Sequence, residues 1–325
     1  NNTVYGSDTA DFIELPAFSE NKIDYSPLQK LDFDIKATAQ SFIYANKPYL
    51  ATKAEVKLKQ GVLNVLSFET QSDKSTISGD FVLNSNGTPN IKGKYYIAGV
   101  KTAALGGKVY RLNSGILSAN GTFDSNASSV SDFMNNLNSS GSFQLTDTVM
   151  KGWDLDIIKF DIEQRKSVAG FDNFVRSSLT SGESAFTKIS GKYTIKDGNV
   201  SADKILWQSP VVDMYMQLSL SLKDKLVNAS FDTIYHNASF SDVLKFALEG
   251  DLANPQLKLD LSDTTTRIEE TDKLANAALI QRENEKNEII KNKIAATQKN
   301  IDDALLIADR VSSEAERFKP KSSDR

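Results

Sequence analysis

Alternating apolar and polar residues dominate the chain before Asp263. The longest such run begins at Val212, and Asp, Tyr, Gln and Ser separate its apolar positions. A period of two is that of a β-strand with one apolar and one polar face. The run is longer than the usual strand of ~5–6 residues. Its apolar face therefore predicts an extended covered surface, formed by Val212, Met214, Met216, Leu218, Leu220 and Leu222.

Further segments repeat this alternation along the chain. They include "LDFDIKATA" (31–39), "AEVKLKQGVLNV" (54–65), "TISGDFVLN" (76–84), "IKGKYYIAGV" (91–100), "DIIKFDIEQ" (156–164) and "PQLKLDLSD" (255–263). Three dipeptides typical of hairpin turns lie among them: Asn86-Gly87, Asn120-Gly121 and Asp197-Gly198. Strands joined by short turns predict an antiparallel sheet. Three segments favour short helices instead: 129–138, 169–179 and 240–248.

The alternation ends near Asp263. Residues 264–318 contain neither Pro nor Gly, and their apolar residues follow the 4-3 spacing of a heptad. This pattern predicts a long helix whose candidate seam is Ile290, Ile294, Ile301, Ala304, Ala308 and Val311. Two roles stay open for the seam: packing on the sheet or on a neighbouring protein, and self-association as a coiled coil.

A repeated unit runs through the strand region. Residues 54–84 align with residues 191–221, and the alignment places Gly61 over Gly198. Both copies have the pattern strand, glycine turn, strand, further strand. Repetition of one supersecondary unit is typical of elongated architectures.

These patterns together predict a mainly β fold. We expect an elongated, curved antiparallel sheet with repeated strand units and a few short helices, followed by a long C-terminal helix. The expected organisation is a linker or incomplete N-terminal segment at 1–30, the sheet at 31–262, the amphipathic or coiled-coil helix at 263–318 and a flexible tail at 319–325.

Composition narrows the classes of function. The net charge of −4 offers no basic surface for nucleic acid, and the chain has no cysteine for catalysis or metal binding. Its one histidine, His236, is expected to be an incidental surface residue. Trp153 and Trp207 are expected to stand apart, without an aromatic platform around them. The sequence therefore predicts a protein that is not an enzyme and has neither catalytic residues, metal site nor cofactor.

Several motifs in their order resemble the C-terminal region of the AsmA-like family. Phe186, Gly191, the Asp197-Gly198 turn, Ser209-Pro210 and the long strand from Val212 match its signature, and "LEGDLANPQLKLDLS" (248–262) is similar to its closing strand pair. The resemblance covers about 31–262. It implies a non-enzymatic periplasmic protein of a Gram-negative bacterium, anchored in the inner membrane by an N-terminal helix that precedes this sequence.

The larger members of that family resemble bridge-type lipid transfer proteins. The implied partner is phospholipid, bound along an apolar β trough, and a role in supporting outer-membrane assembly is the related possibility. The run from Val212 to Leu222 is then the candidate lipid-facing surface. The alternative is a structural or interaction module, an adhesin or scaffold, whose helix at 264–318 binds a protein partner. An outer-membrane barrel is disfavoured by the short helices and the charged C-terminal helix.

Overall fold

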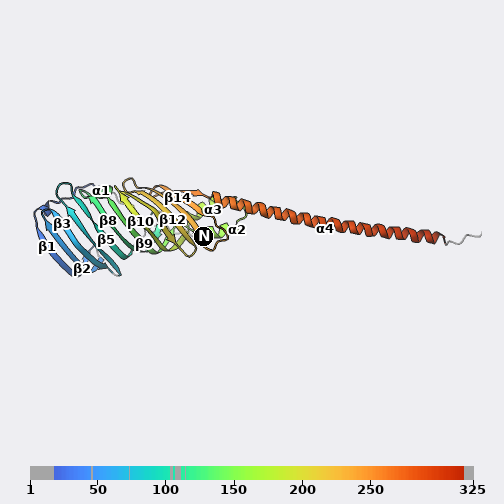
Figure 1. Cartoon of the computed structure of the whole chain (residues 1–325), viewed down its shortest axis with the longest axis horizontal. Helices are drawn as coiled ribbons and strands as arrows, with labels where there is room; N and C mark the ends of the chain where they lie inside the picture. Colours follow the sequence, from blue (N-terminus) through green and yellow to red (C-terminus); the bar gives the residue numbers. More distant parts are fainter. Residues whose placement is uncertain are drawn as a thin grey trace, which may run out of the picture. The chain divides into compact units, whose positions relative to one another are not determined.

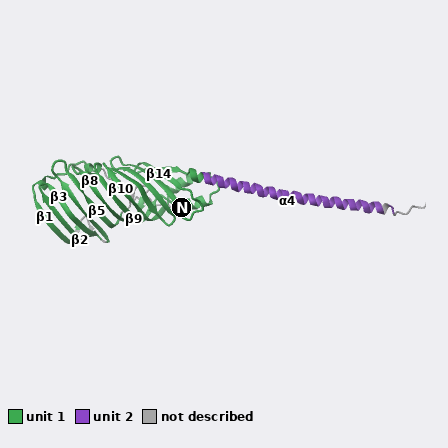
Figure 2. Ribbon diagram, in the orientation of Figure 1, with its two compact units in different colours: residues 1–265 green, residues 266–325 purple. Residues whose placement is uncertain are grey.

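The computed structural model describes residues 18–44, 47–72, 74–102, 105–106, 111–113 and 115–317. The expected tail at 319–325 and the first part of the expected N-terminal linker, 1–17, lie outside these residues. The chain divides into unit 1, residues 1–265, and unit 2, residues 266–325 (Figure 2).

Unit 1 is built on one antiparallel sheet, as the sequence predicts. Its strands lie side by side from β1 to β15 in an open, curved arrangement (Figure 1). Neighbours follow the order β1-β2-β3-β4-β5-β8-β9-β10-β11-β12-β13-β14-β15, and β7 pairs with β6 and β9. The strands are β1 (Phe33–Tyr44), β2 (Lys47–Lys59), β3 (Val62–Ser72), β4 (Ser75–Asn84), β5 (Asn90–Lys101), β6 (Leu105–Gly106), β7 (Arg111–Asn113), β8 (Ile116–Asn126), β9 (Asn138–Lys151), β10 (Glu183–Lys196), β11 (Asn199–Gln208), β12 (Val212–Ser221), β13 (Leu226–Tyr235), β14 (Leu244–Asp251) and β15 (Gln256–Asp260).

Short helices interrupt the strands. They are η1 (Ser26–Gln29), α1 (Val130–Asn135), α2 (Leu155–Gln164) and α3 (Phe171–Ser178). The predicted helices at 129–138 and 169–179 correspond to α1 and α3. Ser129 caps α1, because its side chain accepts a hydrogen bond from the Asp132 backbone N–H at 2.9 Å. The long C-terminal helix is also confirmed as α4 (Ser262–Arg317).

The strand predicted at 156–164 is wrong, because this segment is α2. Its buried side chains, Leu155, Ile158 and Ile162, follow helical spacing, and Asp154 caps the helix by accepting from the Ile157 N–H at 3.1 Å. Apolar residues on both faces of a short helix also give a local alternation. Burial of one helix face in the tertiary structure favours the helix over the strand at this segment.

The helix predicted at 240–248 is also wrong. Residues from Leu244 onward form β14, whose buried residues Leu244, Phe246 and Leu248 alternate with more exposed ones. Phe246 lies opposite Phe231 of β13, and the two rings stack with centroids 4.7 Å apart. Packing across the sheet therefore overrides the helical tendency of "VLKFAL".

The repeated unit appears as two matching sets of three strands, β2–β3–β4 and β10–β11–β12. Each first hairpin closes through two residues with positive φ, Gln60-Gly61 (50° and 75°) and Asp197-Gly198 (48° and 72°). Two consecutive residues with positive φ are typical of a type I′ turn. The register between the second and third strands then shifts at the same distance from each turn, between Val65 and Phe68 and between Ala202 and Ile205.

Asn120-Gly121 is not a turn, contrary to the prediction. It lies within β8, where Gly121 pairs with Tyr95 of β5 and with Gly141 of β9. A Cβ at Gly121 would lie 2.6 Å from the Ser140 carbonyl oxygen and 2.8 Å from the Tyr95 hydroxyl. Close packing over the backbone therefore explains this glycine.

An aromatic cluster forms the closed core of unit 1. Trp153 and Trp207 contact each other with ring centroids 5.4 Å apart, which corrects the expectation that they stand apart. Phe186, Phe231 and Phe246 complete the cluster. The buried faces of α2 and α3 contribute further apolar side chains to the core: Leu155, Ile158, Ile162, Phe171 and Val175.

Candidate functional site

The apolar face of β12 is divided between a closed and an open environment. Val212, Met214 and Met216 are buried, with 1%, 0% and 9% of their surface exposed. Leu218, Leu220 and Leu222, the other three candidate lipid-facing residues, stay partly exposed. Leu222 lies just beyond the strand, and its N–H donates to the Gly198 carbonyl at 3.1 Å. The first three residues belong to the closed core, whereas Leu218 and Leu220 lie on a more accessible part of the same face.

Leu220 belongs to a line of apolar residues that crosses almost the whole sheet. Directly paired residues of neighbouring strands share a face. Following the pairs from β1 to β12 gives one line, broken by Gly93 and Ser139, which we call the apolar row: Ile35, Val56, Val65, Phe81, Phe123, Ile195, Val200 and Leu220.

Most of the apolar row is neither a closed core nor a free surface. Ile35 is 47% exposed and Val65 8%, and the other members have intermediate exposure. A sheet packed against a second layer buries such residues almost completely. The row therefore forms a long apolar surface that remains accessible to an apolar ligand.

The opposite face of these strands is polar. Asp80, Lys94, Thr122 and Thr194 alternate with the apolar positions and are exposed. Ion pairs cross the first two strands on this side, from Lys36 to Glu55 and from Asp34 to Lys57, each at 3.2 Å. Exposed pairs of this kind add little stability. They nevertheless show that this side of the sheet faces water.

The segment before β1 borders one end of the strands. The Tyr25 hydroxyl donates to the Ala127 carbonyl at 2.6 Å, and the Ile23 N–H donates to the Ser128 carbonyl at 2.9 Å. Gln29 reaches the Ser85 carbonyl at 3.3 Å. These bonds tie residues 23–29 to the turns that follow β4 and β8, so this segment is part of unit 1.

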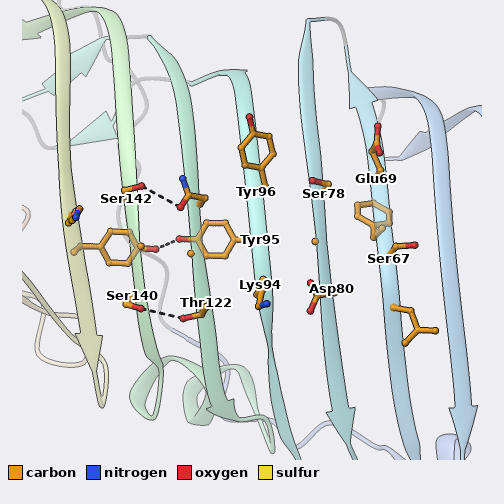
Figure 3. A pocket seen from close by; sticks show the side chains of 18 of the residues that line it. Ser67, Glu69, Ser78, Asp80, Lys94, Tyr95, Tyr96, Thr122, Ser140 and Ser142 are labelled. Carbon is orange, nitrogen blue, oxygen red and sulfur yellow. Dashed lines mark hydrogen bonds between the residues drawn. The ribbon is translucent and has the colours of Figure 1, made fainter.

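A hollow of about 980 Å³ lies in the middle of the sheet. Residues from β2 to β10 line it, among them Gly79, Tyr95, Gly121, Gly141 and Tyr193 (Figure 3). The three glycines and two tyrosines occupy directly paired positions. Each lies two residues along its strand from the line of the apolar row, and therefore on the same face. Sequence reasoning did not predict this hollow, and it named Gly121 only as a turn residue. The alternation in "GKYYIAG" (93–99) indicates a strand that carries Tyr95. The pairing of strands that are distant in sequence is what brings Tyr95 and Tyr193 together.

Unit 2 carries a second apolar surface. The seam residues Ile290, Ile294, Ile301 and Val311 are 54%, 65%, 48% and 61% exposed, and Ala304 and Ala308 are also exposed. Leu279, Ile290 and Ile301 recur at every eleventh residue, which equals three helical turns of about 3.67 residues. The exposed residues therefore follow a nearly straight stripe along α4.

The histidine and the carboxylates are the side chains with the most obvious capacity for chemistry or metal binding. His236 lies near Asp213, with 3.4 Å between Nε2 and the carboxylate oxygen, and both side chains are partly exposed. Among the described residues, no group of three His, Asp or Glu side chains is arranged to hold a metal ion. In the same residues, no helix is both long and apolar enough to cross a membrane.

Comparison with known proteins adds no relative. No protein-family model matches the sequence, and searches of characterised proteins and of solved structures find no similar protein.

Proposed function

We propose that the protein is a non-enzymatic lipid-handling protein of the bacterial envelope, in which phospholipid acyl chains lie along the apolar row. The observation that carries this proposal is the partial exposure of one apolar line from β1 to β12. When acyl chains cover exposed apolar side chains, both are removed from water. This burial is favourable by about 25 cal/mol of free energy per Å² of apolar surface.

The resemblance to the AsmA-like family supports the same proposal. It suggests a periplasmic location, an inner-membrane anchor outside this sequence, and a role in lipid transfer or outer-membrane assembly. The open, curved sheet is compatible with a trough of this kind. The closed core at the other end of β12 anchors the sheet without contributing to lipid contact.

Site-specific photo-crosslinking tests the proposal. A photoreactive residue at Ile195 or Leu220, on the apolar row, should capture phospholipid from vesicles of phosphatidylethanolamine and phosphatidylglycerol. The neighbouring positions Thr194 and Ser219 are matched controls, because adjacent residues of a strand point to opposite faces. We expect strong capture from the first pair and little from the second. Equal capture from both pairs, or none from either, would contradict the proposal.

An interaction module is the second candidate, and the exposed stripe on α4 favours it. Isolated helices with large exposed apolar residues gain stability by pairing with another helix. We expect the protein to self-associate through the seam. Replacing Ile294 and Ile301 together by glutamate should then shift its sedimentation from an oligomer to a monomer.

Replacing Lys293 and Lys299 by glutamate provides the control for that experiment. These positions lie on α4 outside the seam, so the oligomer should persist although the net charge changes twice as much as in the seam variant. A wild-type protein that sediments as a monomer at all concentrations would exclude self-association and leave a different protein as the partner.

A further inference from the structure

Tyr95 and Tyr193 face each other across two intervening strands. Tyr95 lies on β5 and Tyr193 on β10, with β8 and β9 between them, and their hydroxyl groups form a hydrogen bond (Figure 3). Directly paired positions place both rings on the face that also carries the apolar row. The two rings therefore bridge the central strands on their apolar side.

Two glycines make this arrangement possible. Gly121 and Gly141 are the paired residues between the tyrosines. A Cβ at Gly121 would lie 2.8 Å from the Tyr95 hydroxyl, and one at Gly141 would lie 2.7 Å from the Tyr193 hydroxyl. Any larger residue would lift the rings from the sheet. The tyrosines thus lie low over the backbone on the apolar face of the sheet.

The pair holds more hydrogen-bonding capacity than it uses. Two phenolic groups carry two protons, and their mutual bond uses one of them. Among the described residues, neither hydroxyl has another hydrogen-bond partner. Burial raises the pKa of Tyr95 above its ordinary value, so the phenol stays protonated at neutral pH. One O–H donor therefore remains available to a third group.

The surroundings indicate which group suits this donor. Tyr95 and Tyr193 lie two residues from Gly93 and Ile195 in the line of the apolar row, about 6.6 Å along the strands. The nearest lysines in sequence, Lys94 and Lys192, are exposed and point to the opposite face. A neutral donor beside an apolar surface suits a neutral acceptor attached to a hydrocarbon chain, and does not suit an unpaired phosphate.

We propose that the tyrosine pair donates its spare O–H to an ester carbonyl of a diacyl glycerolipid whose chains lie on the apolar row. This inference rests on the proposed function and specifies its ligand. The lipid would be held by apolar contact along its chains and positioned by one hydrogen bond at the ester.

Matched diester and diether phosphatidylcholines test this inference, because they differ in the ester carbonyls alone. In competition for the protein of residues 1–325, we expect the diester to bind about 3- to 10-fold more tightly, as one net hydrogen bond predicts. Tyr95→Phe or Tyr193→Phe alone should retain the preference, because the remaining hydroxyl keeps a free proton. The double variant should bind both lipids equally, with diether binding unchanged.

Tyr96→Phe is the matched control. Tyr96 is the next residue on β5, lies on the opposite face and is 51% exposed, so its hydroxyl should have no influence on lipid preference. If neither lipid binds, the proposed function itself fails. If both bind without ester preference, or if the preference survives in the double variant, lipid handling stands and the role of the tyrosine pair is excluded.

Discussion

Replacing Trp153 by alanine should destabilise the protein by about 3–5 kcal/mol, the range for removing a buried tryptophan. Trp153 is 1% exposed and contacts Trp207, Phe231 and Phe246 with ring centroids 5.1–5.4 Å apart. The Ser184 hydroxyl further fixes its backbone by donating to the Trp153 carbonyl at 3.0 Å. Removing the indole leaves a cavity that this well-connected backbone cannot close.

Urea unfolding followed by circular dichroism measures this effect. Phe160→Ala is the matched control, because Phe160 lies on α2 and its side chain is 65% exposed. Its loss should change the free energy of unfolding by less than about 0.5 kcal/mol. Similar losses for the two variants would show that the aromatic cluster is not the core of unit 1.

Glutamate at two positions of β12 should have opposite consequences. Met214 is fully buried, in direct register with Trp207 and Thr233. Met214→Glu places a carboxylate there without a cationic partner, which should cost more than about 3 kcal/mol and unfold much of the protein. Leu220→Glu introduces the same charge on the partly exposed apolar row. That carboxylate can reach water, so we expect a loss of about 1 kcal/mol at most.

Lipid binding should separate the two variants further. Leu220→Glu should remain folded and lose most of its photo-crosslinking to phospholipid, measured from a photoreactive residue at Ile195. Ser219→Glu, on the polar face of the same strand, should keep both its fold and its lipid capture. A Leu220→Glu protein that unfolds as completely as Met214→Glu would mean that the row is part of the closed core, and the lipid proposal would fail.

Local sequence patterns were sufficient where one interaction dominates the conformation. The sequence predicted glycine turns at Gly61 and at Asp197-Gly198, and the structure has two consecutive residues with positive φ at each, as a type I′ turn needs. The helix from Ser262 follows from a long segment without Pro or Gly. The same patterns failed at α2 and β14, where short apolar segments are compatible with both helix and strand.

At the candidate site, too, local sequence patterns predicted one feature correctly and missed another. The alternation in β12 correctly indicated that its apolar residues share a face, but it treated the run from Val212 to Leu222 as one surface. Burial divides that run, because Met214 belongs to the closed core and Leu220 to the open row. No periodicity can show where on a sheet a covering layer ends, since that depends on residues distant in sequence.

The sequence by itself determined the antiparallel β class, the repeated hairpin unit and the long C-terminal helix, because these depend on side-chain period, turn residues and the absence of helix breakers over short distances. The tertiary structure alone decided the meeting of Trp153 with Trp207, the bridge between Tyr95 and Tyr193, and the line from Ile35 to Leu220. Each of these depends on strand register. Register is set by turns, bulges and burial acting together over the whole sheet, so no single segment of the sequence contains it.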